Sequence, residues 1–426
     1  MPGLLLGQVI FLLAISLLVP RLARSQTQAW ERDGSTHAVD HLDPIEIDAT
    51  LTLPKLIDLT MAKYPDTTWL TSLEEEAAAI AERSKSWTAG ASQATIGYQS
   101  ISSFRLNYAT GSVQVPLWNL GQRDAENTLA NQAETSAEFQ AVAIKLRVAG
   151  LVRGALWDMA LQKIRYDQAQ VDLDAYEKLL ATIKRYVEVG DLPRADELLA
   201  QTEFLQKRSV FTMAEAELMH ARKRYASITQ TTKVPGSYEE NLAALKEIGQ
   251  NHPSLVAING QIDRKQAELN AIKSIGSGQT NVIAGILSDE GVDQRSNKAE
   301  FFNVGVSIPF GGSAHIAPHI ASINVELNRL IADREQLYRD LEQAHHEAEH
   351  NLEVNRVELA TANEQKKVSE ELLNMTHLAF SVGEIDLIDL LKIQSRTQQA
   401  ILNAKERAVM LQRDKALYNQ AVGVMP

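Results

Sequence analysis

The chain contains no cysteine, and only 12 of its 426 residues are proline and 22 are glycine. The absence of cysteine excludes disulfides, thiolate metal sites, cysteine catalysis and a lipid-anchored N-terminal cysteine. Because Ala, Leu, Glu and Gln are abundant where Gly and Pro are sparse, the composition predicts long helices. The formal net charge of −12 argues against a general nucleic-acid-binding role, so we expect no nucleic-acid partner.

The sequence also lacks the motifs of common active sites. It has no Gly-rich phosphate loop, no Gly-x-Ser-x-Gly elbow and no evident catalytic dyad. We therefore expect a protein that is not an enzyme, and no cofactor.

Two Gly-centred breaks indicate an internal duplication. Val189–Gln201 and Val382–Gln394 both read Val-Gly-acid-aliphatic, with an Asp six residues after the Gly and a final Gln. The two glycines are 193 residues apart, and so are Pro116 and Pro309. Two landmarks at one spacing predict two copies of one structural unit. We place the first copy at residues 53–230 and the second at 231–426.

The N-terminal residues have the pattern of an export signal. Residues 4–19 are almost wholly apolar, and Ala23-Arg24-Ser25 has the small-x-small form of a cleavage site. A 16-residue apolar run is short for a membrane span, although an uncleaved anchor is the alternative. We predict a signal peptide at 1–25 and an extended arm at 26–52.

Each copy is expected to begin with a short helix, a Pro-containing break and an amphipathic helix. A β-hairpin follows, at about 94–118 and about 281–310. Phe302, Val304 and Val306 alternate with polar or small residues, which is typical of a strand with one apolar face. The expected initial helices are 53–63 and 66–87 in the first copy, and 242–250 and about 255–272 in the second. The expected strand-to-helix junctions are marked by Pro116, Gly121, Pro309 and Gly311.

A very long helix follows each hairpin, at about 122–187 and about 316–381. About 65 residues at ~1.5 Å each give a helix of roughly 100 Å, a length that implies coiled-coil packing. The Gly turns reverse each helix into a return helix, at 194–228 and 385–423. The expected fold is mainly α with a small β part, a duplicated unit of long coiled-coil helices plus a β-hairpin.

The predicted strands pose a physical problem. Four strands cannot close a barrel, and an open sheet in lipid leaves edge N–H and C=O groups unsatisfied at a cost of several kcal/mol each. In an exported protein without an adequate transmembrane helix, several chains can solve this by pooling their strands. The alternative is a water-soluble four-stranded cap on a coiled-coil hairpin.

The duplicated plan and four motifs resemble the TolC family of outer-membrane efflux proteins over residues 53–423. The motifs are Val-Pro-Leu-Trp-Asn-Leu-Gly-Gln-Arg (115–123), Tyr-Val-Glu-Val-Gly-Asp-Leu (186–192), Ser-Ile-Pro-Phe-Gly-Gly (307–312) and Val-Gly-Glu-Ile-Asp-Leu-Ile-Asp-Leu-Leu (382–391). Segments 194–200, 308–312 and 317–321 resemble the branch that works with heavy-metal (cobalt–zinc–cadmium type) resistance pumps.

The resemblance implies a homotrimer in the outer membrane of a Gram-negative bacterium. Three chains would supply twelve strands for a lipid-embedded β-barrel and twelve helices for a periplasmic α-barrel. The implied partners are an inner-membrane resistance–nodulation–division (RND) pump and a periplasmic adaptor (membrane-fusion) protein. The implied function is a passive duct of a tripartite efflux system, with divalent metal cations as the expected solutes.

The resemblance also places the Gly turns at the periplasmic tip, where the aperture closes and the adaptor docks. Asp389 matches a family position whose acidic side chains ring the constriction, whereas the next acidic position is Lys392 here. We expect Asp386 and Asp389 to face the entrance and Lys392 to pair with an acidic neighbour. The alternative is that Asp196 and Asp389 cap the helices after the turns. The expected tip and docking residues are Gly190, Asp191, Leu192, Asp196, Gly383, Glu384 and Ile385.

Two histidine pairs have a spacing that suits a metal ion. His315/His319 and His346/His350 are i, i+4 pairs on predicted helices, but no third ligand is obvious in the sequence. Solvated polar residues are the preferred interpretation, so no metal site is assigned.

Two other functions stay open. One is an exported coiled-coil adaptor or tether without a pore. The other is an outer-membrane duct for type I protein secretion.

Overall fold

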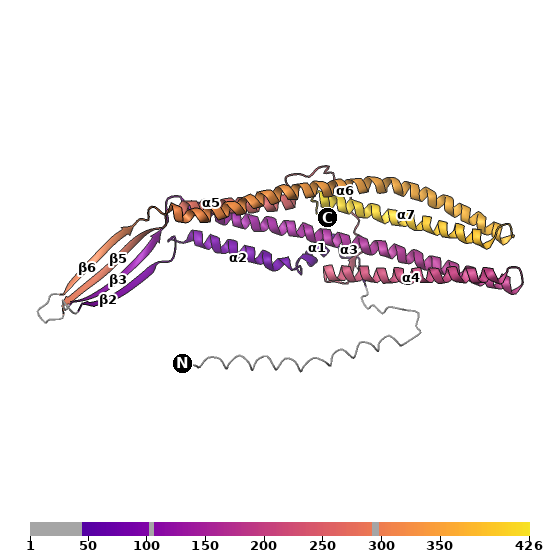
Figure 1. Cartoon of the computed structure of the whole chain (residues 1–426), viewed down its shortest axis with the longest axis horizontal. Helices are drawn as coiled ribbons and strands as arrows, with labels where there is room; N and C mark the ends of the chain where they lie inside the picture. The colour runs from indigo at the N-terminus through magenta and orange to yellow at the C-terminus, as the bar shows by residue number, and fades with distance from the viewer. Residues whose placement is uncertain (1–44, 102–105, 292–297) are drawn as a thin grey trace, which may run out of the picture. The chain divides into compact units, whose positions relative to one another are not determined.

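The computed structural model describes residues 45–101, 106–291 and 298–426 (Figure 1). The predicted signal peptide and most of the predicted arm lie outside these residues. The first copy contains α1 (Leu53–Met61), α2 (Asp66–Lys85), β2 (Gln93–Ile101), β3 (Leu106–Leu117), α3 (Gln122–Glu188) and α4 (Arg194–Thr229). The second contains α5 (Pro253–Ile275), β5 (Thr280–Gly291), β6 (Ala299–Ser307), α6 (Ser313–Ser381) and α7 (Leu387–Ala421).

The two long helices have 67 and 69 residues. Helix α6 begins earlier than expected, at Ser313, and includes Pro318 in its second turn, where the missing N–H removes one helical hydrogen bond. Among the described residues, no helix is both long and apolar enough to cross a membrane.

The expected short helix at 242–250 is wrong. The structure has no helix over these residues, because side chains of α7 take up the backbone groups of the segment. The Asn419 amide accepts from Ala243 N–H at 2.8 Å and donates to Asn241 C=O at 2.9 Å. The Tyr418 hydroxyl donates to Leu245 C=O at 2.8 Å. We call residues 231–252, at the start of the second copy, the linker.

A small parallel pair of strands was not predicted. β1 (Glu46–Asp48) lies beside β4 (Lys233–Pro235), so the end of the predicted arm pairs with the start of the linker. The remaining four strands form one antiparallel sheet in the order β2-β3-β5-β6. The two hairpins are therefore joined through β3 and β5, with Val113 opposite Ala284, and β2 and β6 are the open edges.

The register separates the sheet into an apolar and a mainly polar face, because directly opposite residues of antiparallel strands share a face. The apolar face carries Ala94, Ile96, Tyr98, Val113, Val115, Leu117, Val282, Ala284, Ile286, Phe302, Val304 and Val306. The other face carries Gln93, Thr95, Gln99, Thr110, Ser112, Gln114, Asn281, Asn303 and Ser307, with Ile101, Leu106, Tyr108, Pro116, Ile283, Leu287 and Phe301 as apolar or aromatic exceptions. At the end of the sheet far from the helices, the apolar face also carries the polar residues Ser100, Asn107, Ser288, Glu290 and Glu300. The apolar face is largely exposed, at 90% for Ile96 and 73% for Phe302.

Helix α3 lies at the centre of the helical part (Figure 1). It packs against α2 and α4 on one side and against α5 and α7 on the other, and α6 packs against α5 and α7. Helices α2 and α4 therefore follow one another along α3, and α5 and α7 follow one another between α3 and α6. The middle of α3 is fully buried at Val148, Ala149 and Val152, in a core shared with α1 and α4.

Candidate functional site

The first Gly turn is a Schellman motif at the end of α3. Gly190 has φ +87° and its N–H donates to Val187 C=O at 3.1 Å. Asp191 N–H donates to Tyr186 C=O at 2.8 Å. These two bonds satisfy carbonyls that the helix end leaves free, and the left-handed conformation between them favours glycine.

The second Gly turn has the same geometry at the end of α6. Gly383 has φ +76° and its N–H donates to Phe380 C=O at 3.1 Å, while Glu384 N–H donates to Ala379 C=O at 2.9 Å. The duplication thus extends to individual hydrogen bonds, at positions 193 residues apart.

The helices that leave the turns are capped differently. The Asp386 carboxylate accepts from Asp389 N–H at 2.8 Å and is the N-cap of α7. The corresponding N-cap of α4 is Pro193, which offers no side-chain acceptor. The interpretation of Asp196 and Asp389 as caps is therefore wrong. Both lie in the first turn of their helices, where the acidic group complements the helix dipole.

A shared apolar core holds the two turns together. Tyr176, Leu180 and Ile183 of α3 and Ala200 of α4 are buried against Leu387, Leu390 and Leu391 of α7. Leu192 and Ile385, expected as docking residues, pack partly buried against this core. The exposed apolar side chains at the turns are instead Val189, Val382 and Ile388. Sequence reasoning missed these three, although Val189 and Val382 precede the turn glycines.

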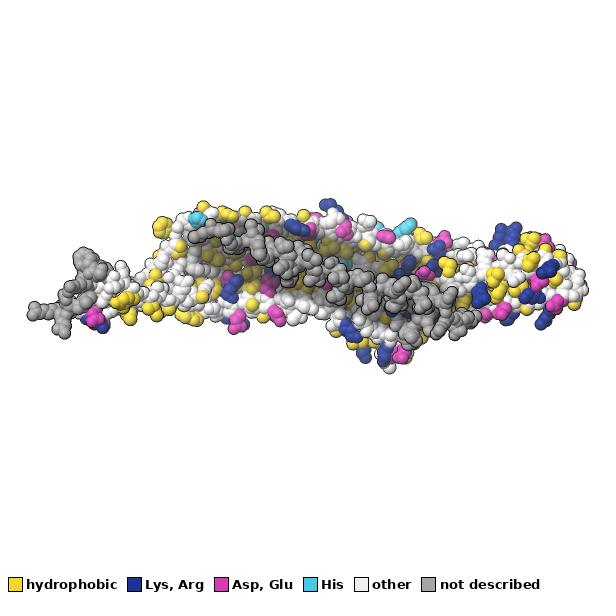
Figure 2. All heavy atoms as spheres, turned by 60° about the horizontal axis from the view of Figure 1, so that its bottom comes forward, with side chains coloured by type: hydrophobic (Ala, Val, Ile, Leu, Met, Phe, Trp, Pro, Cys, Tyr) yellow, Lys and Arg dark blue, Asp and Glu magenta, His cyan; other side chains and the backbone are white. Residues whose placement is uncertain are grey.

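The charged residues at the second turn reach solvent. Asp386, Asp389 and Lys392 are all exposed, as are Asp191 and Glu384, whereas Asp196 is half-buried. Within the described part of this single chain, Lys392 forms no ion pair, so the expected pairing with an acidic neighbour is not made inside the chain. Figure 2 shows side chains of both charges and exposed hydrophobic ones together at the end that carries these turns.

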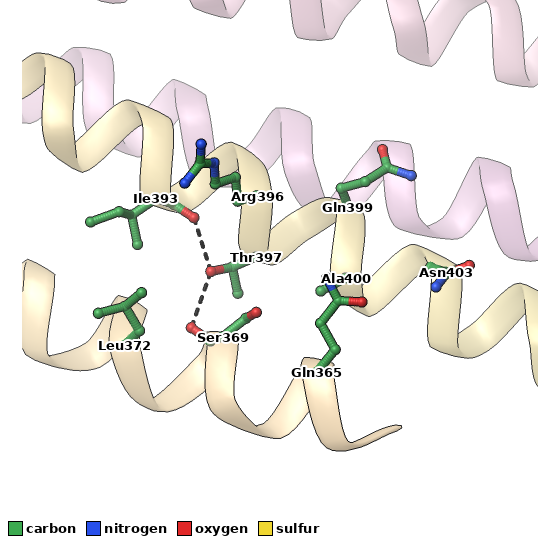
Figure 3. A pocket seen from close by; sticks show the side chains of 9 residues that line it. All are labelled: Gln365, Ser369, Leu372, Ile393, Arg396, Thr397, Gln399, Ala400 and Asn403. Atoms are coloured by element: carbon green, nitrogen blue, oxygen red, sulfur yellow. Dashed lines mark hydrogen bonds between the residues drawn. The ribbon is translucent and has the colours of Figure 1, made fainter. Parts of the chain in front are cut away.

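A polar groove lies between α6 and α7 beyond the turn (Figure 3). The Thr397 hydroxyl donates to Ile393 C=O at 2.9 Å, and its oxygen also lies 3.1 Å from Ser369 C=O across the groove. Leu372 and Ile393 line one end of it, and the other lining residues are Gln365, Arg396, Gln399, Ala400 and Asn403. The groove thus offers amide and guanidinium groups, with two apolar side chains at one end.

Polar groups connect α3 and α7 behind the turns; Gln168 is buried, and Asp172 and Lys405 are half-buried. Lys405 Nζ of α7 donates to Gln168 Oε1 at 2.7 Å, and Gln168 Nε2 donates to Asp172 Oδ1 at 2.7 Å. Burial raises the pKa of the Asp172 carboxyl, although the bond from Gln168 opposes the shift. Burial also raises the pKa of the nearby Tyr176 hydroxyl well above its usual range. These groups fix α7 against α3 without forming an evident reactive centre.

A buried arginine in the middle of α3 was missed by sequence reasoning. The Arg153 guanidinium is fully buried and binds the Glu240 carboxylate with two bonds, at 2.8 and 2.6 Å. It also donates to Gln420 Oε1 at 2.6 Å and to Val424 C=O at 3.0 Å. The sequence signal that could have revealed it was a single arginine, directly after Val152, on a helix face that is otherwise apolar. This arginine joins α3, the linker and the end of α7.

The strand-to-helix junctions of the two copies are linked to each other. Gly121 is the N-cap of α3 with φ +77°, and Gly311 has φ +73° just before α6. Asn119 Nδ2 donates to Ile275 C=O at 2.8 Å and to Gly278 C=O at 2.9 Å, and Gly312 N–H donates to Ser277 Oγ at 3.1 Å. Both junctions are therefore bonded to the connection between α5 and β5. Pro116 lies within β3 opposite Asn281, and Pro309 follows β6 and approaches Gly278, so both prolines are near strand ends.

The histidine pairs predicted as weak metal candidates gain no third ligand among the described residues. His315, His319, His346 and His350 are all exposed. A different group comes together instead, His345, His346 and Glu349, whose ligand atoms lie within 4.8 Å of one another.

No protein-family model and no curated protein matches the sequence. Solved structures do match. CusC, whose crystal structures concern conformational changes accompanying folding and transmembrane channel formation, is 11% identical with a TM-score of 0.70, over 88% of this chain and 92% of that one. The outer membrane channel CmeC of Campylobacter jejuni is 11% identical with a TM-score of 0.68, over 87% of this chain and 85% of that one. The outer membrane channel MtrE of Neisseria gonorrhoeae, in its open state, is 15% identical with a TM-score of 0.65, over 87% of this chain and 89% of that one. At these identities the likeness concerns the fold, and the mainly helical fold with a small sheet that the sequence predicts is confirmed. The chain has the fold of solved outer-membrane channels.

Proposed function

We propose that this chain is one subunit of a TolC-type outer-membrane duct that exports solutes passively. It would form a homotrimer in the outer membrane of a Gram-negative bacterium, with its helical part in the periplasm. The observation that carries the proposal is the four-stranded sheet, which has an exposed apolar face, a mainly polar opposite face and two open edges.

The two faces of the sheet suit a wall between lipid and water. Ile96, Phe302 and Val304 would face acyl chains, and Gln114 and Asn303 on the other face would line an aqueous lumen. The open edges of β2 and β6 would leave unsatisfied backbone groups in lipid, each costing several kcal/mol. Pairing β6 of one chain with β2 of the next satisfies these groups, and three chains then supply twelve strands.

Like the sheet with its two open edges, the helical part has two outer sides, and each carries exposed apolar side chains. Val354, Val368 and Met375 of α6 and its C-cap residue Val382 are exposed and separated by multiples of seven residues, the repeat of a coiled-coil seam. On the opposite side of the helical part, α4 exposes Leu198, Leu205 and Met213. Contact of α6 in one chain with α4 in the next would bury both sets and close a ring of twelve helices.

The subunit count can be tested with the purified full chain in detergent. Light scattering should give the mass of a trimer, and Val368→Glu/Met375→Glu should shift the mass towards the monomer, because charges would be buried in the seam. Lys367→Gln, an exposed change beside the seam, should keep the trimer. A monomeric wild-type chain, or a double variant that stays trimeric, would overturn the proposed assembly.

The entrance of the duct is proposed at the Gly turns, with Asp386, Asp389 and Lys392 around it. Carboxylate rings favour cations, and the Lys392 ammonium of one chain can pair with a carboxylate of the next. The test is single-channel conductance in planar bilayers. Asp389→Ala/Lys392→Ala should change the conductance or its cation preference, and an unchanged channel would contradict the role of these residues.

The partners are proposed to be a periplasmic adaptor at the turns and an inner-membrane RND pump. Val189, Val382 and Ile388 provide exposed apolar contacts for the adaptor, and the groove of Figure 3 provides polar ones. Divalent metal cations of the heavy-metal branch are the proposed solutes. A deletion strain should become sensitive to metal cations while its secreted proteins stay unchanged. The reverse result would favour type I protein secretion.

A further inference from the structure

The middle of α6 carries a histidine whose surroundings differ from those of the other histidines on this helix. His345 is buried, whereas His346 one residue later is exposed. The segment lies beside a small apolar core of Ala348, Leu352 and Ala421. These two adjacent histidines lie outside the Gly turns and the sheet, so the features described above give them no role.

The hydrogen bonds around His345 determine which ring nitrogen is free. The Tyr418 hydroxyl donates its proton to Leu245 C=O at 2.8 Å. Towards His345 Nε2, 3.4 Å away, that hydroxyl can therefore only accept, so Nε2 carries the proton of the neutral ring. Nδ1 is left with its lone pair. A ring N–H held by an outer hydrogen bond is the usual arrangement for a histidine that binds a metal ion.

Two further donor atoms lie close to this ring. Glu349 follows His345 by four residues and His346 by three, so its side chain is a neighbour of both histidines on the helix surface. The ligand atoms of the three side chains all lie within 4.8 Å of one another, and the two imidazole rings have centroids 5.8 Å apart. Ligands of a tetrahedral zinc ion are about 3.4 Å apart, so side-chain rotation of the exposed His346 can bring the set into range.

We propose that His345, His346 and Glu349 form a binding site for a single divalent transition-metal ion of the Zn²⁺ class, with water in the remaining position. Two imidazole nitrogens and one carboxylate oxygen are a ligand set of open zinc sites. Tyr418 is a positioning residue that holds the His345 ring and at the same time holds the linker at Leu245. Metal binding would therefore stabilise the contact between α6, α7 and the linker.

The site can be tested by calorimetric titration of Zn²⁺ into the full chain, purified without a polyhistidine tag and stripped with EDTA. The wild type should bind one Zn²⁺ per chain with higher affinity than any residual sites. His346→Ala and Glu349→Gln change groups that are not buried, so they should fold normally and lose at least about 10-fold in affinity. His350→Ala and His319→Ala, exposed histidines on the same helix, should bind as the wild type does.

The role of Tyr418 needs a measurement that a packing defect would not change. Tyr418→Phe keeps the ring but cannot accept from His345, so Zn²⁺ affinity should fall about 10-fold and the visible spectrum of bound Co²⁺ should change. Its melting temperature in EDTA is the control for packing. Equal Zn²⁺ affinity in the wild type and His346→Ala, or no stoichiometric binding at all, would overturn the proposal. Either result leaves the channel proposal unaffected.

Discussion

Helices α3 and α6 occupy corresponding places in the two copies, yet their surroundings differ. Helix α3 packs against α1, α2, α4, α5 and α7, whereas the main helix neighbours of α6 in the described part of the chain are α5 and α7. Arg153 of α3 corresponds, at the 193-residue spacing, to His346 of α6. The first is fully buried and paired, and the second is exposed. The duplication preserves helix length and turn geometry, but the neighbours of each helix determine which of its side chains are buried.

The turns show which local features the copies share. Both have a left-handed Gly and the same two hydrogen bonds, because this geometry depends on the backbone alone. The caps that follow differ, with Asp386 in one copy and Pro193 in the other. Backbone-determined features are therefore retained, and side-chain-determined features have diverged. Four predictions test this distinction.

The largest effect is expected at Arg153. Arg153→Met leaves Glu240 buried without its partner, which should lower the free energy of unfolding by about 3–5 kcal/mol. The matched change at the corresponding position, His346→Ala in EDTA, should stay within about 0.5 kcal/mol of the wild type. Urea unfolding in detergent, followed by circular dichroism, measures both. Similar losses for the two variants would mean that the helices are not in different environments.

The turn glycines should be equivalent. Gly190→Ala and Gly383→Ala should each destabilise by about 1–2 kcal/mol, because an L-residue is forced into a left-handed conformation. An added Cβ meets nothing within 4 Å at either site, so the cost comes from the backbone alone and should be equal in the two copies. Gly154→Ala, which also has free space but lies inside α3, should instead stabilise by about 0.5–1 kcal/mol. Clearly unequal losses at the two turns would contradict the proposed equivalence.

The cap distinguishes the second copy from the first. Asp386→Ala should cost about 1 kcal/mol, because Asp389 N–H loses its acceptor. Asp386→Asn keeps an oxygen acceptor and should cost much less. Thermal unfolding of both variants measures the difference. If Asp389→Ala cost more than Asp386→Ala, the cap would be assigned to the wrong residue.

The smallest effect concerns pH. His252 is the buried N-cap of α5 and its Nδ1 accepts from Ser254 N–H at 3.2 Å, whereas Tyr64-Pro65 occupies the corresponding break in the first copy. Burial lowers the pKa of His252. Its contribution to stability is therefore present above about pH 6.5, the ordinary pKa of histidine, and is lost as the pH falls below it.

His252→Asn keeps a capping side chain that does not titrate. The drop in melting temperature between pH 8 and pH 5.5 should therefore be smaller in His252→Asn than in the wild type. An equal drop in both would show that His252 does not contribute to the acid sensitivity.

Much of the fold was accessible from the sequence, because its features are local or periodic. The spacing of Gly190 and Gly383 gave the duplication, and the alternation around Phe302 is the alternation of faces in β6. The candidate site was accessible only in part. The turns follow from their glycines, but the cap at Asp386 depends on where α7 begins, a boundary that is uncertain by a turn from pattern alone.

The remaining features depend on contacts between distant residues. Arg153 meets Glu240 and Gln420 across 87 and 267 positions of the chain, so periodicity could not pair them. The segment at 242–250 has a helical composition, yet it forms no helix, because Asn419 and Tyr418 of α7 bind its backbone groups. In the same way, the His346/His350 spacing suggested a metal pair, while the structure groups His346 with His345 and Glu349.

The end-to-end placement of four of the helices has a mechanical consequence. Helices α3 and α6 are each one continuous helix, although α6 lacks one backbone donor at Pro318. The path through α7 and α5 instead has a joint, where a Cβ on Gly423 would come within 2.6 Å of the His252 ring. The path through α4 and α2 has another, where Lys63 Nζ donates to Gln230 C=O at 3.1 Å. Two of the four helical paths are therefore continuous and two are interrupted, so we expect the helical part to bend or twist most readily at the level of the interruptions. Arg153 joins α3 to the end of α7 at that level.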